Sequence, residues 1–196
     1  MATLPATSLL DRYEAYAAIN DAVSADAPGA DRDAEVFLWV SAVSGRIDQL
    51  CGPVVAREKV EKYDGGNGIL RLRTAPALSI TSVAASGTTV DEADYELVDD
   101  NRFTPYLLHT GRWPSGRRNL TVTYQAGRAE DTASVDPLFK LAAATILTGM
   151  WAKYGGAWAR GGDPFTEAGS GPQFFDELTH NVKRWLGDEL LPPAVA

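Results

Sequence analysis

The stretch VFLWVSAVSGRIDQLCGP, residues 36–53, contains the point at which the chain changes its secondary structure. Apolar residues recur in it at alternating steps of four and three, the spacing of an amphipathic helix, at Val36, Val40, Val43, Ile47 and Leu50. Gly52 and Pro53 end this helix, because glycine accepts the left-handed cap conformation and proline lacks the amide hydrogen needed to continue. The stretch therefore predicts a helix followed by a boundary in the fold.

An earlier helix is predicted upstream of this one. Ser8 is followed three residues later by Asp11, a spacing that resembles a capping box. Apolar and aromatic residues then line one side, and the helix fades near Ala22. A solvated loop over residues 24–30 ends at Asp31, the expected N-cap of the second helix.

Downstream of Pro53, over residues 54–127, short segments alternate between apolar and polar residues. Leu70 and Leu72, for example, alternate with Arg71 and Arg73, which indicates strands with one buried face. Glycine and asparagine at residues 64–68 predict a hairpin turn, and Ser86-Gly87 predicts another. We expect at least five strands.

The helical spacing returns at Asp136, with Pro137 in the first turn, where its missing amide is harmless. We expect a narrow face of small residues in this third helix, at Leu138, Leu141, Ala142, Thr145, Gly149 and Ala152. A glycine-rich loop follows over residues 157–171. Pro172 begins a last helix with a stripe at Phe175, Leu178, Val182, Trp185 and Glu189.

These elements predict an α+β fold: a small four-helix bundle with an antiparallel β insert between the second and third helices. The expected parts are a first helical half at residues 1–53, the β insert at 54–127 and a second helical half at 128–196.

Composition limits the classes of function. The formal net charge is −8 and the sequence pI is about 4.7, so the chain as a whole repels nucleic-acid phosphates. Its longest apolar stretch is broken by Lys140, and none approaches the roughly 20 residues of a membrane span. Residues 1–11 lack the features of a secretory signal. Cys51 is the only cysteine, which excludes an internal disulfide and favours a cytoplasmic origin.

Motifs for catalysis or cofactor binding are missing from the sequence. The loop at residues 64–68 lacks the lysine of a phosphate-binding loop, and neither His109 nor His180 has the context of a catalytic triad. The acids between Asp91 and Asp100 lack the spacing of a calcium loop and are interpreted as a solvated edge. We therefore expect no enzyme activity, no cofactor and no metal.

Tryptophan and arginine favour partner binding over chemistry, since both are common interface anchors. The candidate interface residues are Trp113, Arg117 and Arg118 on a turn between strands, Trp158, Arg160 and Phe165 in the glycine-rich loop, and Lys183, Arg184 and Trp185 in the last helix. The alternatives are an ordinary capped hairpin for the turn and simple core packing for the tryptophans.

The order and wording of the segments resemble the head-tail connector family of tailed bacteriophages, also called head-to-tail adaptor or head completion proteins. The resemblance covers residues 9–154 and is a pattern, not one signature. It rests on these segments: Ile47-Asp48-x-x-Cys51-Gly52, Tyr63-Asp64-Gly65, Leu70-x-Leu72, Ala75-Pro76, Ile80-x-x-Val83, Tyr95-x-Leu97, Trp113-Pro114, Leu120-x-Val122-x-Tyr124-x-Ala126-Gly127, and the proline-started helix running to Trp151.

The resemblance implies a virion protein that forms a ring, commonly of twelve copies, in the phage neck. Such a ring docks on the portal protein, lines the channel through which DNA passes without tight binding, and meets a stopper or tail-side neck protein. Assembly would take place in the bacterial host cytoplasm, with no membrane involved. We expect the loop at residues 157–171 to fold on docking.

Other functions remain open. The nearest is another neck protein, a stopper or tail terminator, although those are expected to be mainly β. A carbohydrate-binding or host-binding module would use Trp113 and Tyr106 as stacking platforms. An enzyme would need a polar pocket that no motif in the sequence indicates.

Overall fold

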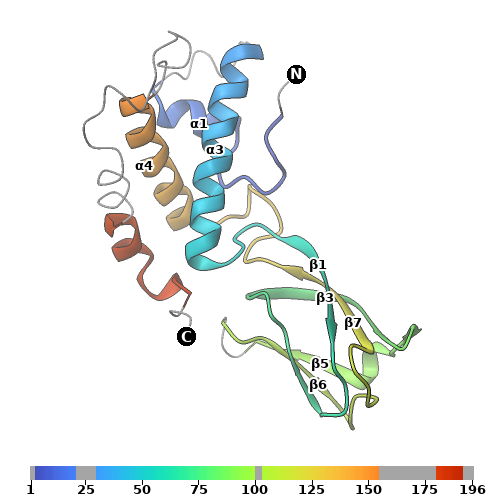
Figure 1. Ribbon diagram of the computed structural model, residues 1–196. Helices are drawn as coiled ribbons and strands as arrows, with labels where there is room; N and C mark the ends of the chain where they lie inside the picture. Colours follow the sequence, from blue (N-terminus) through green and yellow to red (C-terminus); the bar gives the residue numbers. More distant parts are fainter. Residues whose placement is uncertain (1–2, 21–29, 100–102, 155–179, 192–196) are drawn as a thin grey trace. The chain divides into compact units, whose positions relative to one another are not determined.

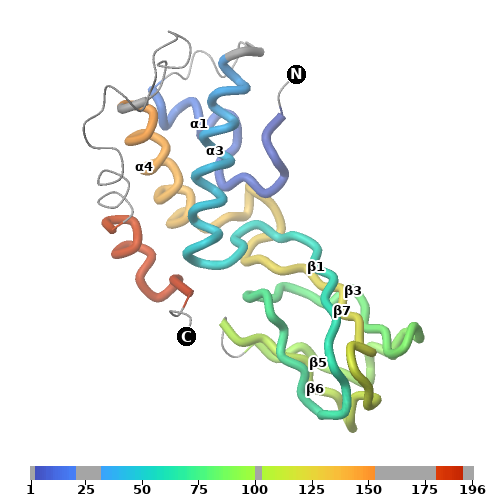
Figure 2. Tube along the Cα trace, viewed as in Figure 1, coloured from blue at the N-terminus to red at the C-terminus, as the bar shows by residue number. Residues whose placement is uncertain are grey.

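The computed structural model describes residues 3–20, 30–99, 103–154 and 180–191 (Figure 1). The chain divides into two compact units. A helical unit combines Met1–Cys51 with Thr132–Leu190, and a β unit combines Gly52–Asp131 with Leu191–Ala196. The chain passes from the helical unit into the β unit after Cys51 and returns to the helical unit at Thr132 (Figure 2).

Four segments are α-helical in the described part of the helical unit. They are α1 (Arg12–Ala18), α3 (Ala30–Cys51), α4 (Pro137–Tyr154) and residues 180–186, which lead into the short 3-10 helix η3 (Gly187–Glu189). The predicted end of the second helix, at Cys51 before Gly52-Pro53, is confirmed, and α4 begins at the predicted Pro137. The helices enclose an apolar core that includes Tyr16, Val36, Val40, Val43, Ile47, Phe139, Leu147, Val182 and Leu186.

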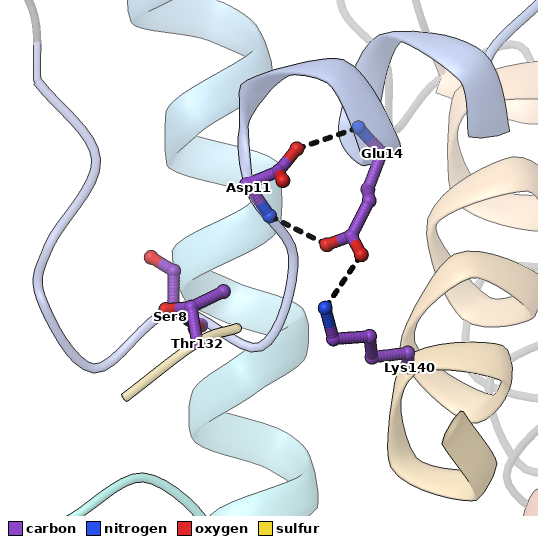
Figure 3. A network of polar contacts seen from close by, with 5 residues as sticks. All are labelled: Ser8, Asp11, Glu14, Thr132 and Lys140. Carbon is purple, nitrogen blue, oxygen red and sulfur yellow. Dashed lines mark hydrogen bonds and ion pairs between the residues drawn. The ribbon is translucent and has the colours of Figure 1, made fainter. Parts of the chain in front are cut away.

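The first helix is capped by a different residue from the predicted one. Asp11 is the N-cap: its side chain accepts from the backbone N–H of Glu14, and the Glu14 carboxylate accepts from the backbone N–H of Asp11 (Figure 3). Ser8 lies buried before the helix, and its carbonyl accepts a hydrogen bond from Thr132 at 2.7 Å. The predicted capping box, Ser8 with Asp11, lies three residues before the observed one, Asp11 with Glu14. The two pairs share Asp11 and have the same spacing.

The buried side of α4 also differs from the prediction. The residues that face the core are Phe139, Ala142, Ala143, Ile146, Leu147 and Met150. Leu141, which was assigned to the buried face, is 58% exposed. Burying Phe139 and Ile146 removes more apolar surface from water than burying the small residues would, so the larger side chains determine the orientation.

The described part of the β unit contains seven strands in two antiparallel sheets. They are β1 (Arg57–Tyr63), β2 (Ile69–Arg71), β3 (Ala77–Ala85), β4 (Thr88–Thr89), β5 (Tyr95–Val98), β6 (Tyr106–His109) and β7 (Leu120–Ala126). One sheet has the order β1-β7-β3-β4 and the other β2-β6-β5. A short 3-10 helix, η1 (Glu92–Asp94), precedes β5.

The predicted fold class, a four-helix bundle with a β insert, is wrong. The β unit is a two-sheet structure with its own core, made of residues from both sheets and the loops between them. That core contains Tyr63, Leu70, Leu72, Ala77, Val83, Leu107, Trp113, Leu120, Val122, Tyr124 and Ala126. The alternation in the sequence indicated strands, but it did not reveal that two sheets would bury their inner faces against each other.

The connection at residues 64–68 is likewise not the predicted hairpin. It joins β1 to β2, and these strands belong to different sheets. The second predicted turn is confirmed: Ser86 and Gly87, with φ values of 51° and 88°, join β3 to β4 in an antiparallel hairpin. Both residues therefore adopt the left-handed conformation that a two-residue hairpin requires.

Candidate interaction surfaces

Two loops at one end of the β unit are fastened together by hydrogen bonds. The backbone N–H of Gly65 donates to the carbonyl of Gly116 at 2.9 Å, and the backbone N–H of Arg118 donates to the Asp64 carboxylate at 2.5 Å. A Cβ atom on Gly65 would lie 1.9 Å from the carbonyl oxygen of Pro114, so only glycine permits this approach. The loop at residues 110–119 is therefore held in one conformation by the turn at residues 64–68.

This loop separates the three residues that the sequence grouped as one interface. Trp113 is only 2% exposed and packs in the core, with its ring centroid 4.6 Å from that of His109 and 6.0 Å from that of Tyr95. Arg117 and Arg118 are exposed. The indole thus anchors the loop from inside, and the two arginine side chains lie on the surface.

The last helical segment presents a second surface. Val182 and Leu186 are buried in the helical unit, while Lys183, Arg184 and Trp185 are exposed. Trp185 is 48% exposed, a large apolar side chain beside two cations. Of these residues, tryptophan and arginine are enriched in partner-binding surfaces.

Trp158, Arg160 and Phe165, the other candidates, lie outside the described residues. So does the loop at residues 157–171 that was expected to fold on docking.

A third surface lies on the outer face of the sheet β2-β6-β5. Ile69 and Leu108 are cross-strand partners and are 50% and 41% exposed. The sequence analysis missed this pair. Its signal was the apolar residue at Ile69 next to Leu70, which breaks the strict alternation of the strand.

A first cluster of ionisable groups with shifted pKa values is hydrogen-bonded within the helical unit. A hydrogen bond from Arg12 holds the pKa of Asp33 below its ordinary value, although burial acts in the opposite direction. Burial, with a hydrogen bond to Asp33, raises the pKa of Tyr16 to about 12. These three residues connect α1 to α3 and have a structural role.

A second internal cluster lies in the β unit. Burial would raise the pKa of Glu61, but hydrogen bonds from Tyr63, Thr74 and the Arg73 backbone N–H outweigh it and lower that pKa. The Glu61 carboxylate on β1 accepts hydrogen bonds from the segment after β2 and has a structural role.

Three further features of the described residues concern metal binding, the histidines and membrane insertion. Within these ranges, no group of three or more His, Cys, Asp or Glu side chains is placed to hold a metal ion. The Nδ1 atom of His109 accepts from the backbone N–H of Gly111 at 2.9 Å, and His180 is exposed. No helix in the described ranges is long and apolar enough to cross a membrane.

No protein-family model matches the sequence, and no curated protein matches it. Solved structures do match. A chain from the neck of an empty gene transfer agent (GTA) particle, computed with C6 symmetry, has a TM-score of 0.61 and 18% identity. A chain from the virion of the native particle has a TM-score of 0.62 and 16% identity. A chain from the native neck, computed with C12 symmetry, has a TM-score of 0.60 and 14% identity.

The chain has the fold of these particle proteins. Each match covers 94% of this chain and 92% of the other, so the likeness includes residues of both the helical unit and the β unit. At identities of 14–18% the likeness shows the fold.

Proposed function

We propose that this protein is a structural component of a virion neck. The observation that carries the proposal is the fold shared with chains of neck structures over 94% of the length. Fold alone does not specify function, but here the surfaces agree with it. The exposed groups described above are arginines, a lysine, a tryptophan and an apolar strand pair, all suited to protein contacts.

The specific role in this proposal is that of the head-to-tail adaptor. Copies form a ring, of twelve in the expected stoichiometry, that docks on the portal protein and continues the DNA channel toward a stopper or tail-side neck protein. The net charge of −8 supports a channel through which DNA slides, because a strongly basic lumen would retain DNA by counterion release. The role involves binding and no catalysis.

The test is negative-stain electron microscopy of the purified protein mixed with the portal of the same particle. We expect a second ring stacked on the portal, with a mass that gives the number of copies. A protein that stays monomeric at high concentration and does not bind the portal would contradict the adaptor role.

The surface of residues 180–186 allows a sharper version of this test. We expect a Lys183→Glu, Arg184→Glu double variant to lose portal binding about tenfold or more, as for charges at an interface, with unchanged thermal stability. Arg46→Glu is the control for each single variant, Lys183→Glu and Arg184→Glu, since Arg46 is an exposed cation of α3 in the same unit and each of the three changes lowers the net charge by two. Equal loss in all three would point to net charge instead of a local contact.

A further inference from the structure

The β unit has two lateral edges that are defined by its topology. β1 and β2 are the first strands of the two sheet orders and are joined directly by residues 64–68. β4 and β5 are the last strands of those orders and are joined through η1. β1 and β4 are thus the opposite edge strands of one sheet, and β2 and β5 those of the other. Because each connection is only five residues long, we infer that β1 and β2 form one side of the unit and β4 and β5 the opposite side.

The side formed by β1 and β2 carries exposed positive charge. We call it the basic edge, and it consists of Lys62, Arg71, Arg73, Arg117 and Arg118. The last two belong to this edge because their loop is bonded to the β1–β2 connection, through Arg118 to Asp64 and through Gly116 to Gly65. The exposed acids here are fewer: Glu58 and Asp64.

The opposite side carries exposed negative charge. We call it the acidic edge, and it consists of Asp91, Glu92, Asp94 and Glu96. The sequence from residue 88 to residue 99 contains no lysine, arginine or histidine. The sequence analysis interpreted these acids as a solvated edge. In the structure they lie on the edge of the β unit opposite to the basic edge.

Protection of edge strands from aggregation does not account for this separation. Charged side chains on edge strands prevent indiscriminate pairing, but charge of either sign does so. Cations on one edge and anions on the other would let the basic edge of one copy attract the acidic edge of the next. Electrostatic complementarity of this kind sets orientation and suppresses wrong pairings.

We propose that the basic edge of one copy packs against the acidic edge of the next copy. This inference rests on the proposed neck ring and names the surface that joins its subunits. Because the two edges lie on opposite sides of one unit, the contact is head-to-tail, the type of interface that generates closed rings. Ile69, half-exposed on β2 beside Arg71, adds apolar area to the basic edge.

The size of the edges predicts that each contact is weak. β4 has two residues, β2 three and β5 four, so only β1, with seven, is longer than about 13 Å, and the contact is limited by the shorter strands of the two edges. A stable interface buries about 800 Å² on each partner, more than such short strands supply. The edges therefore orient the copies, and further contacts in the ring are needed to hold it.

The test uses charge reversal in the full-length chain. One variant, Arg71→Glu with Arg117→Glu, changes the basic edge to net negative, so that both edges are acidic. The other, Glu92→Lys with Asp94→Lys and Glu96→Lys, changes the acidic edge to net positive, so that both edges are basic. We expect each alone to need about a tenfold higher concentration for assembly, as for like charges facing each other. An equimolar mixture should assemble nearly as well as the wild type, because the two variants can alternate.

Ring formation is measured by mass photometry and negative-stain microscopy, with and without the portal, in about 0.1 M and about 1 M salt. Screening lengths fall from about 10 Å to about 3 Å between these conditions, so the rescue by mixing should disappear at high salt. Arg46→Glu on α3 is the control that changes charge away from both edges. Circular dichroism confirms that each variant is folded.

The outcomes separate this inference from the proposed function. If the wild type forms rings and both charge-reversal variants form them equally well, the edge contact is wrong while the neck role stands. If the wild type never forms rings but the two variants associate on mixing, the edge contact is supported and the ring is wrong. If neither occurs, both are wrong.

Discussion

Arg12 Nη1 lies 2.8 Å from Asp33 Oδ2 and joins α1 to α3. The other carboxylate oxygen, Oδ1, accepts from the Tyr16 hydroxyl at 2.7 Å, and the Arg12 guanidinium lies over the rings of Tyr16 and Phe37. A short first helix, with only seven residues, is marginal by itself. Its attachment to the long α3 through one carboxylate makes the helical unit sensitive to the charge on Asp33.

Acid should therefore weaken the helical unit. The pKa of Asp33 is below its ordinary value of 3.8 in the folded chain, so the folded state favours the ionised form. The stability that this preference supplies is present above the ordinary pKa and is lost as pH falls through the lower, folded pKa. We expect the urea midpoint to decrease below about pH 4, in the window between those pKa values.

The matched variant for this prediction is Asp33→Asn, which keeps the shape and removes the titration. It should be less stable than the wild type at pH 7, and the difference between the two should become smaller below about pH 4. A difference that stayed constant across this range would show that Asp33 makes no contribution through its charge.

Replacing Trp113 tests whether it is a core residue or a partner anchor. Trp113→Ala should lower the free energy of unfolding by about 3–5 kcal/mol, as for a large buried aromatic. Arg117→Ala, four residues away on the same loop, should change it by less than about 0.5 kcal/mol. Urea unfolding measures both. If Trp113→Ala left stability unchanged, the indole would not be part of the core of the β unit.

The hydroxyl of Tyr63 is predicted to stabilise the β unit. Tyr63→Phe removes a donor to the Glu61 carboxylate and an acceptor for the backbone N–H of Arg73. We expect a loss of about 1–3 kcal/mol, because the Glu61 carboxylate loses one of its hydrogen bonds and the Arg73 N–H keeps only its longer one, to Glu61. Tyr13→Phe is the control, since that side chain is mostly exposed. Comparable effects of both changes in urea unfolding would contradict the assignment.

Two glycines should respond in opposite directions to alanine. Gly65→Ala brings a Cβ to within 1.9 Å of the Pro114 carbonyl oxygen and should cost about 1–3 kcal/mol through forced backbone shifts. Gly45→Ala meets no atom within 4 Å in α3 and should add about 0.5–1 kcal/mol, by helix propensity. Thermal unfolding of the two variants gives the comparison. A destabilised Gly45→Ala would mean that this face of α3 is covered.

The helices show how far a periodic pattern predicts structure. Gly52-Pro53 ended the second helix as expected, and Pro137 began α4. The buried side of α4 was mispredicted because the helix is apolar on several sides. When Leu141 and Phe139 are both available for burial, the neighbouring helices determine which one is covered.

The interaction surfaces were predictable only in composition. The sequence identified Arg117, Arg118, Lys183, Arg184 and Trp185 as exposed candidates, and the structure places each of them at the surface. It did not distinguish Trp113, which faces inward. Nor could it reveal that the acids near Asp91 and the arginines of a distant loop occupy opposite edges of one unit, since that depends on strand order.

The sequence by itself determined where helix gives way to strand, because the spacing of apolar residues and the backbone limits of glycine and proline act over a few neighbours. Only the tertiary structure decided that the strands form two sheets with a shared core, and which edge receives each charge. Strand pairing joins residues far apart in the chain, such as Glu61 and Val122, and local preferences carry no information about such partners.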